Sequence, residues 1–142
     1  MVFDTGSAND QRALARLETD MIGWLTSVTP EGQPQTMPIW FLWHDGEAVI
    51  YGDKRARRNR NIEANPRVTL HLNSNEKGGD VVVLEGEARI DADGPAMADN
   101  APYLAKYADW IRDFMNTPEE MFTIYNTVIR IRPTRGIVIG AS

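Results

Sequence analysis

Five basic residues stand within seven positions of the chain and are the strongest candidates for chemistry in the sequence. This basic cluster consists of Lys54, Arg55, Arg57, Arg58 and Arg60. The remainder of the chain is acidic, because the whole sequence has 15 Lys and Arg against 20 Asp and Glu. Charge-assisted hydrogen bonds contribute about 1.5–3 kcal/mol each, so two or three of these arginines could hold a phosphate firmly. We interpret the cluster as a phosphate site; the alternative is a solvated surface paired with nearby carboxylates.

The position of the basic cluster favours the anion site. It follows a predicted strand and begins a short predicted helix within residues 53–66. Backbone N–H groups are free at such a helix start, and the helix dipole attracts negative charge there. No glycine-rich loop precedes the cluster, so it is not a Walker loop. The net charge of −5 and the lack of interleaved aromatic residues predict no nucleic-acid partner and no binding to a membrane surface.

The rest of the sequence offers little for catalysis by side chains alone. The chain has no cysteine and two histidines, which excludes thiolate catalysis, disulfides and cysteine-based metal sites, and we predict no bound metal. No serine lies in the context of a nucleophile elbow. We assign no catalytic residue, and an enzyme built on this chain would need a bound cofactor to carry its chemistry.

One predicted strand, residues 35–44, is apolar on both faces. Met37, Ile39, Phe41 and Trp43 alternate with Pro38, Trp40 and Leu42. A barrel strand buries only one face inside, so the second face must meet a covering helix, a flat ligand or another subunit. A proline within the strand cannot donate to the ladder, which predicts an edge position or an interrupted pairing.

Hydrophobic periodicity and turn residues predict the elements that position these groups. Capping boxes open predicted helices at Ser7 and Thr117, and a third, amphipathic helix has apolar residues at 103, 104, 107, 111, 114 and 115. Strands are expected at residues 22–29, 35–44, 48–51, 67–73, 81–90, 128–131 and 137–139. The first three should form a meander, because Pro30–Gly32 and Asp45–Gly46 are turn signals.

These elements predict one domain over residues 1–142, a mainly β protein built as a small antiparallel barrel with inserted helices. No apolar stretch reaches the ~18 residues that a membrane helix needs. The N-terminus also lacks the core of a signal peptide. We therefore expect a cytoplasmic protein.

The order IGWLTSVTPEGQPQTMPIWFLWHDGEAVIYGDKRARRNRNIEANPRVTL resembles the pyridoxamine-phosphate-oxidase-like split β-barrel superfamily. More closely, it resembles the actinobacterial branch that uses the deazaflavin coenzyme F420. The resemblance covers residues 20–90 and returns in the closing strand, VIRIRPTRGIVIG. Its most specific parts are the G-x-P strand opening at Gly32–Pro34 and the run R-N-I-x-x-N-P-R-V at Arg60–Val68.

The resemblance implies a six-stranded antiparallel split β-barrel of the FMN-binding type, which dimerises and holds a cofactor in a groove at each end of the interface. The family commonly has a lysine three residues before the Asn of R-N-I and a serine two residues earlier. This chain has Arg58 and Ala56 at those positions. One hydroxyl contact to the cofactor phosphate is therefore missing, and Arg55 and Arg57 could compensate for it.

The resemblance also places the tricyclic ring of the cofactor beside the second strand and the end of the third. The residues expected there are Gln35, Thr36, Met37, Pro38, Tyr51 and Gly52.

Together these observations predict a homodimeric, F420-dependent oxidoreductase that transfers hydride between the deazaflavin and a small organic acceptor. Two alternatives remain open. One is an FMN-dependent oxidase or reductase of the pyridoxamine-phosphate-oxidase type, and the other is a non-catalytic protein that binds flavin, deazaflavin or a pigment. Five clustered basic residues exceed what the single phosphate of FMN needs, and the surplus favours the longer anionic tail of F420.

Overall fold

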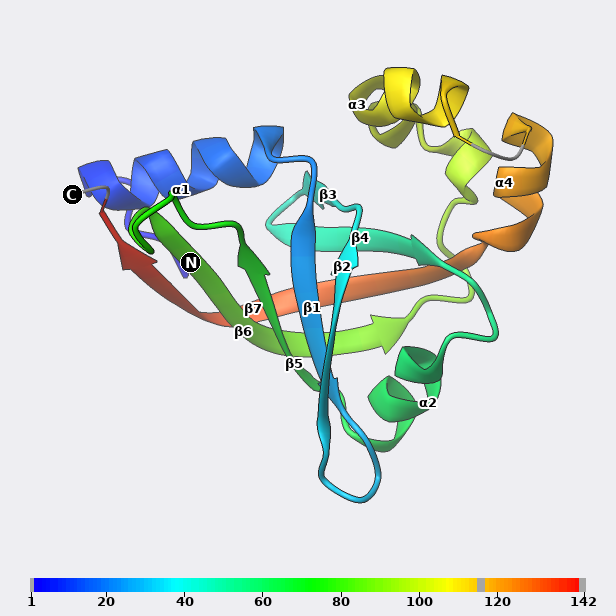
Figure 1. Cartoon of the computed structure of the whole chain (residues 1–142), viewed down its shortest axis with the longest axis horizontal. Helices are drawn as coiled ribbons and strands as arrows, with labels where there is room; N and C mark the ends of the chain where they lie inside the picture. Colours follow the sequence, from blue (N-terminus) through cyan, green and yellow to red (C-terminus); the bar gives the residue numbers. More distant parts are fainter. Residues whose placement is uncertain (1, 115–116, 141–142) are drawn as a thin grey trace.

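A curled antiparallel sheet forms the body of the protein in the computed structural model, which describes residues 2–114 and 117–140 (Figure 1). In this part of the chain the sheet has seven strands in the order β2-β1-β5-β6-β7-β4-β3. The strands are β1 Gly23–Val28, β2 Pro34–Ile39, β3 Leu42–His44, β4 Glu47–Gly52, β5 Arg67–Leu72, β6 Val81–Ile90 and β7 Thr127–Ile139. The mainly β, antiparallel prediction is confirmed, whereas the count of six strands is wrong by one.

The extra strand arises because the predicted strand over residues 35–44 is interrupted. β2 ends at Ile39 and β3 begins at Leu42, and the two lie at opposite edges of the sheet. The predicted three-strand meander is therefore wrong, and its place is taken by two separate hairpins, β1–β2 and β3–β4. Pro38 lies on the edge strand β2, where its missing N–H leaves no gap in the ladder.

Helix α3, Ala101–Arg112, holds the interruption through the backbone of Phe41. The Phe41 N–H donates to the Tyr107 hydroxyl at 2.9 Å, and that hydroxyl donates to the Met21 carbonyl at 2.6 Å. The Lys106 ammonium donates to the Phe41 carbonyl at 2.7 Å. Because these partners replace a neighbouring strand, the chain can leave one edge of the sheet and enter the other without unpaired backbone groups.

Strand β7 also differs from its prediction. The two short strands expected at residues 128–131 and 137–139 are one strand of 13 residues. The register with β6 shifts between Glu85 and Gly86, which face Arg135 and Pro133. Thr134 is the extra residue of a β-bulge, and the bulge accommodates the proline that favoured a turn in the sequence.

Four α-helices in the described residues surround the sheet: α1 Ala8–Thr19, α2 Arg57–Ala64, α3 and α4 Pro118–Ile124. The predicted caps are confirmed, since Ser7 Oγ accepts from the Asp10 N–H at 3.3 Å and Thr117 Oγ1 from the Glu120 N–H at 3.2 Å. Position 115 of the predicted amphipathic helix lies outside the described residues. No helix within the described ranges is long and apolar enough to cross a membrane.

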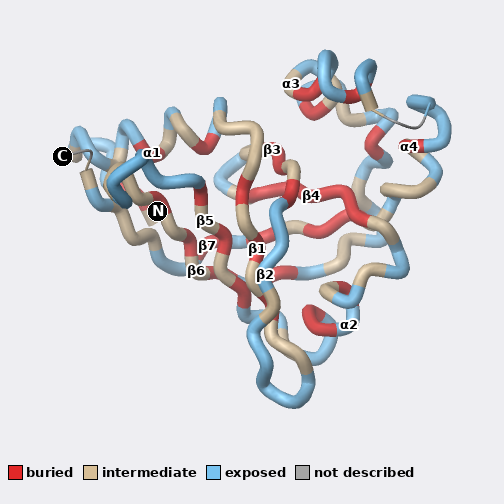
Figure 2. The backbone as a smooth tube through the Cα atoms, in the orientation of Figure 1, coloured by how far each residue is buried: buried red, intermediate tan, exposed pale blue. Residues whose placement is uncertain are grey.

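The buried side chains form two clusters. Figure 2 marks the buried residues in red along the backbone. The first fills the curled sheet and includes Ile39 and Phe41, with α1 and Ile62 of α2 packed against it. The second lies between β3, β4 and the helices α3 and α4, and Leu42 belongs to it, with Trp40 packed at its margin. The second face of the apolar segment is therefore covered by a helix, which was one of the three expected covers.

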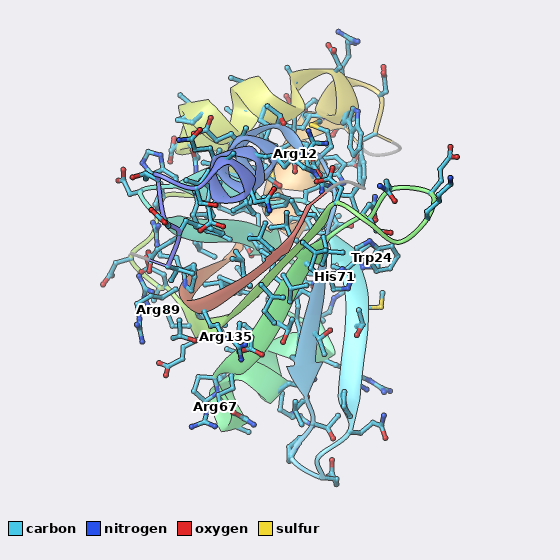
Figure 3. The ribbon with its side chains drawn as sticks, turned by 90° about the vertical axis from the view of Figure 1, so that its left-hand side faces the viewer. Arg12, Trp24, Arg67, His71, Arg89 and Arg135 are labelled. Atoms are coloured by element: carbon cyan, nitrogen blue, oxygen red, sulfur yellow. The ribbon has the colours of Figure 1, made fainter. Side chains whose placement is uncertain are left out.

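The outer face of β1, β5 and β6 is a further surface, and Figure 3 shows it turned towards the viewer. Trp24 and His71 stack there with their ring centroids 6.4 Å apart, and the Trp24 indole N–H donates to the Asn73 side chain at 2.7 Å. The stacking holds the His71 ring against Trp24 on this face.

Candidate functional site

The basic cluster begins directly after β4 and continues into α2, as predicted. Asp53 starts this turn, and its carbonyl accepts from the Ala56 N–H and the Asn59 side-chain amide, both at 3.0 Å. Its carboxylate accepts from the Arg55 backbone N–H at 2.8 Å and from the Arg55 guanidinium at 2.9 Å. These hydrogen bonds lower the pKa of Asp53 to about 2. Arg55 is therefore already paired, which fits the alternative of a solvated, carboxylate-paired surface for this one member of the cluster.

Arg58 is bound differently from Arg55. Its side chain is half-buried, and its Nε is buried without a hydrogen-bond partner. It forms no salt bridge with any residue in the described part of the chain. Burial lowers the pKa of the Arg58 guanidinium from its ordinary value. A half-buried cation that forms no ion pair with a carboxylate loses hydration free energy, unless a bound anion pairs with it. Arg58 therefore carries the geometry of an anion-binding residue.

Gly52 makes room for this arrangement. A Cβ atom at position 52 would lie 2.6 Å from Nη2 of Arg58, closer than side-chain carbons come to other atoms. The guanidinium therefore packs on the bare backbone at the end of β4. Gly52 was expected to touch the cofactor; the structure places it beneath the guanidinium of Arg58, and its role in binding stays a prediction.

Three adjoining hollows run along β2, α2 and the helices α3 and α4. The basic hollow, about 660 Å³, is lined by four members of the basic cluster and by Glu31 and Glu63. The groove, about 590 Å³, lies between β2 and the start of α2. The aromatic pocket, about 350 Å³, lies between β2, β4 and the last two helices. Gln35, Ala56 and Arg57 line both the basic hollow and the groove, so these two spaces adjoin.

Eight of the nine residues predicted to bind the cofactor line these hollows. Arg55, Arg57 and Gln35 line the basic hollow, and Thr36 lines the groove. Met37 and Arg58 line both the groove and the aromatic pocket, and Pro38 and Tyr51 line the pocket alone. Gly52 is the ninth. The structure brings the predicted residues together, and their role in binding stays a prediction.

Asn61 fixes α2 against the sheet. Its buried side-chain amide donates to Ser27 Oγ at 3.0 Å and to Gln35 Oε1 at 2.9 Å, so it joins α2 to β1 and β2 at once. Because the Gln35 oxygen accepts this bond, the Gln35 amide nitrogen is the donor left to face the basic hollow and the groove. Sequence reasoning assigned Gln35 to the cofactor but could not identify the residue that orients it.

Sequence reasoning missed most walls of the aromatic pocket. They come from Trp40, Met97, Tyr103, Phe114, Met121 and Tyr125, in addition to residues of β2 and β4. Tyr103 is 1% exposed, and burial raises the pKa of its hydroxyl. The Tyr51 hydroxyl is occupied, since it donates to the Pro95 carbonyl at 2.8 Å and accepts from the Asn100 amide at 3.0 Å. The helical spacing of 103, 107 and 111 was visible in the sequence, but the partner of that face was not.

Comparisons with known proteins agree with this architecture. The sequence model of the pyridoxamine 5'-phosphate oxidase family matches residues 10–139. An F420 reductase superposes with a TM-score of 0.69 at 24% identity, over 87% of this chain and 94% of its own. No curated protein sequence matches the chain.

Two further solved structures share the fold at lower identity. A FAD-binding protein from Mesorhizobium loti has a TM-score of 0.66 at 16% identity, over 92% of this chain and 91% of its own. The haem storage protein HutZ from Vibrio cholerae has a TM-score of 0.61 at 16% identity, over 92% of each chain. The resemblance to the split-barrel superfamily is thus confirmed. Because the family match spans all seven strands and the basic cluster, the chain belongs to the pyridoxamine 5'-phosphate oxidase family.

Proposed function

We propose that the protein is an F420-dependent oxidoreductase that acts on a small organic acceptor. The observation that carries the proposal is the set of cations without carboxylate partners beside the groove. Arg58 is half-buried and unpaired, and Lys54, Arg57 and Arg60 form no salt bridge with the other residues that the structure describes. Such a surplus suits a ligand with more than one negative charge.

The residues present fit the phosphate-bearing part of this cofactor. Ala56 caps α2 without a side-chain hydrogen bond, so the N-terminus of the helix is open to an anion. Arg57 and Arg58 flank that open end, and Lys54 and Arg60 extend the positive surface outward along the basic hollow. We assign the phosphate to Arg57 and Arg58, and the longer anionic tail to Lys54 and Arg60.

The groove supplies the surface for the ring. Its walls at Leu25, Met37 and Ala56 are apolar, while Gln35 and Thr36 give hydrogen-bonding groups. When bound, reduced F420 would supply a hydride to the acceptor, which also takes up one proton. The chain binds and orients the ligands and limits water around them, and Asn61 holds the Gln35 amide with its nitrogen free.

The structural likeness to an F420 reductase supports the proposal at the level of the fold. The likeness to a FAD-binding protein and a haem storage protein keeps the FMN-dependent and non-catalytic alternatives as outcomes of the test. With a net charge of −5 and one compact basic cluster, we propose neither a nucleic-acid partner nor a membrane partner.

Equilibrium titrations of F420 and FMN at low and high salt test this function. We expect F420 to bind more tightly, and the margin to shrink with salt, because charges are screened over about 8–10 Å near physiological ionic strength. Replacing Arg112, an exposed arginine at the end of α3, with Gln is the matched control and should change neither affinity. Tighter binding of FMN at every salt concentration would replace the proposal with the FMN-dependent enzyme.

We also propose a two-fold homodimer. Met37 is 60% exposed on the edge strand β2, between the groove and the aromatic pocket, which places a large apolar side chain in water. A second copy that covers this edge would bury Met37 and complete the wall of the groove.

A further inference from the structure

We propose that the aromatic pocket is the site of the acceptor, and that it takes a planar, mostly apolar molecule that is neutral or anionic and has one or two fused rings. The inference rests on the proposed function, because it assigns the second reactant of that reaction. The residues that line the aromatic pocket lie outside the basic cluster, except for Arg58, which belongs to both the pocket and the cluster.

The walls of the pocket determine the planar and apolar character of the ligand. Five aromatic residues line it together with aliphatic and methionine side chains: Trp40, Tyr51, Tyr103, Phe114 and Tyr125. The Phe114 and Tyr125 rings meet edge to face at 6.1 Å between centroids, so their faces stand at an angle to one another and form a corner. Aromatic faces and thioethers favour contact with flat, polarisable rings.

The polar groups of the pocket determine the sign of the charge that a ligand can carry. Arg58 lies at the boundary with the groove, and Tyr125 lines the pocket beside it. The hydroxyl of Tyr103, although the residue is 1% exposed, has no hydrogen-bond partner within residues 2–114 and 117–140. None of the twelve described residues that line the pocket is Asp or Glu. The pocket thus offers donors and a positive charge, and a cationic ligand would be repelled by Arg58 and would find no carboxylate among the described lining residues.

The pocket adjoins the groove, so a molecule bound in the pocket would lie beside the cofactor with which it reacts. Met37 and Arg58 line both the pocket and the groove, so a molecule in the pocket borders directly on whatever lies in the groove. The volume, about 350 Å³, is close to the lower end of the roughly 300–1,000 Å³ that ligand sites span. That size suits a small ring system and leaves no space for a second cofactor.

The test uses a matched pair of probes on the protein without cofactor. Calorimetric titration with 2-naphthoate and with 2-naphthylmethylammonium compares the same ring with opposite charges. We expect 2-naphthoate to bind at least tenfold more tightly. Arg58→Gln should abolish this preference, and Tyr103→Phe should weaken naphthoate roughly 10- to 150-fold, as for one charge-assisted hydrogen bond to its carboxylate. Arg112→Gln, at the exposed end of α3 and outside the lining of the pocket, makes the same change of charge as Arg58→Gln and should leave both affinities unchanged.

Tyr103→Phe removes only a hydroxyl that has no hydrogen-bond partner among the residues that the structure describes, so the fold should persist, and the melting temperature verifies this. If that variant does not fold, Tyr125→Phe gives the same measurement at a half-buried position. Equal binding of the two probes, or naphthoate binding that neither Arg58→Gln nor a tyrosine variant changes, overturns the inference.

A second titration separates this inference from the proposed function. Naphthoate should still bind to the protein saturated with F420, because the pocket and the groove are different spaces, but more weakly than without F420, because Arg58 lines both and then also holds the cofactor phosphate. Complete exclusion of naphthoate by F420 would overturn the acceptor site and leave the cofactor proposal standing. Failure of F420 to bind, with naphthoate still bound, would overturn the proposed function and with it the identity of the occupant as an acceptor.

Discussion

Gly52→Ala is expected to weaken cofactor binding through Arg58 without damaging the fold. The added Cβ would lie 2.6 Å from Nη2 of Arg58, so the guanidinium must move. That atom is at the far end of a flexible side chain, and the backbone of Gly52 has no positive φ, so the rearrangement should affect the melting temperature little. The lost charge-assisted hydrogen bond is worth about 1.5–3 kcal/mol, which lowers affinity roughly 10- to 150-fold.

A double-mutant cycle tests the reasoning. Arg58→Ala alone should weaken F420 by about 1–3 kcal/mol, with little loss of stability. Gly52→Ala introduced into the Arg58→Ala protein should have no further effect on F420 affinity, because the guanidinium that the added Cβ would displace is no longer present. The measurement is a fluorescence titration of F420 for the four proteins, with thermal unfolding beside it. If Gly52→Ala leaves affinity unchanged, or lowers it equally in both backgrounds, Gly52 does not act through Arg58.

Three other predictions follow from contacts described above. Asn61→Ala removes buried hydrogen bonds to Ser27 and Gln35 and should lower the free energy of unfolding by about 1–3 kcal/mol in urea denaturation; an unchanged midpoint would show that α2 is held by other contacts. Burial lowers the pKa of Lys106 to about 8, against the opposing effect of Asp20. The folded state then binds fewer protons than the unfolded state between about pH 8 and 10.5, so stability relative to Lys106→Met should rise across that interval and be flat below it. Light scattering at micromolar concentration should report a dimer, and a monomer that still binds cofactor would contradict the proposed assembly.

Local signals in the sequence were sufficient for much of the fold. Ser7 and Thr117 cap their helices with their own side chains, so both helix starts could be read from a few neighbouring residues. The strand predicted at residues 67–73 is present as β5, Arg67–Leu72, and its Val68, Leu70 and Leu72 are buried on one face. The basic cluster was also placed correctly at the start of α2, because strand, turn and helix signals are adjacent there.

The features that could not be predicted depend on contacts between residues far apart in the chain. The interruption at Phe41 is stabilised by Lys106 and Tyr107, about 65 residues later, and nothing in residues 35–44 signals them. The aromatic pocket is assembled from β2, β4 and two helices near the C-terminus, so its walls share no sequence pattern. The pairing of Arg55 with Asp53, and the burial of Arg58 on Gly52, likewise distinguish two arginines that look equivalent in the sequence.

The interruption at Phe41 also bears on the colloidal behaviour of the protein. Residues 39–44 hold no lysine, arginine, aspartate, glutamate or proline and are rich in aromatic side chains, a composition typical of short segments that form intermolecular β-structure. The Tyr107 and Lys106 contacts keep this stretch divided into two short strands and prevent one long, flat edge. Detachment of α3 would free the segment to pair with another molecule. Helix α3, which supplies Tyr103 to the wall of the pocket, therefore also protects the protein against aggregation. We expect Tyr107→Phe to shorten the lag time of heat-induced aggregation in a turbidity assay.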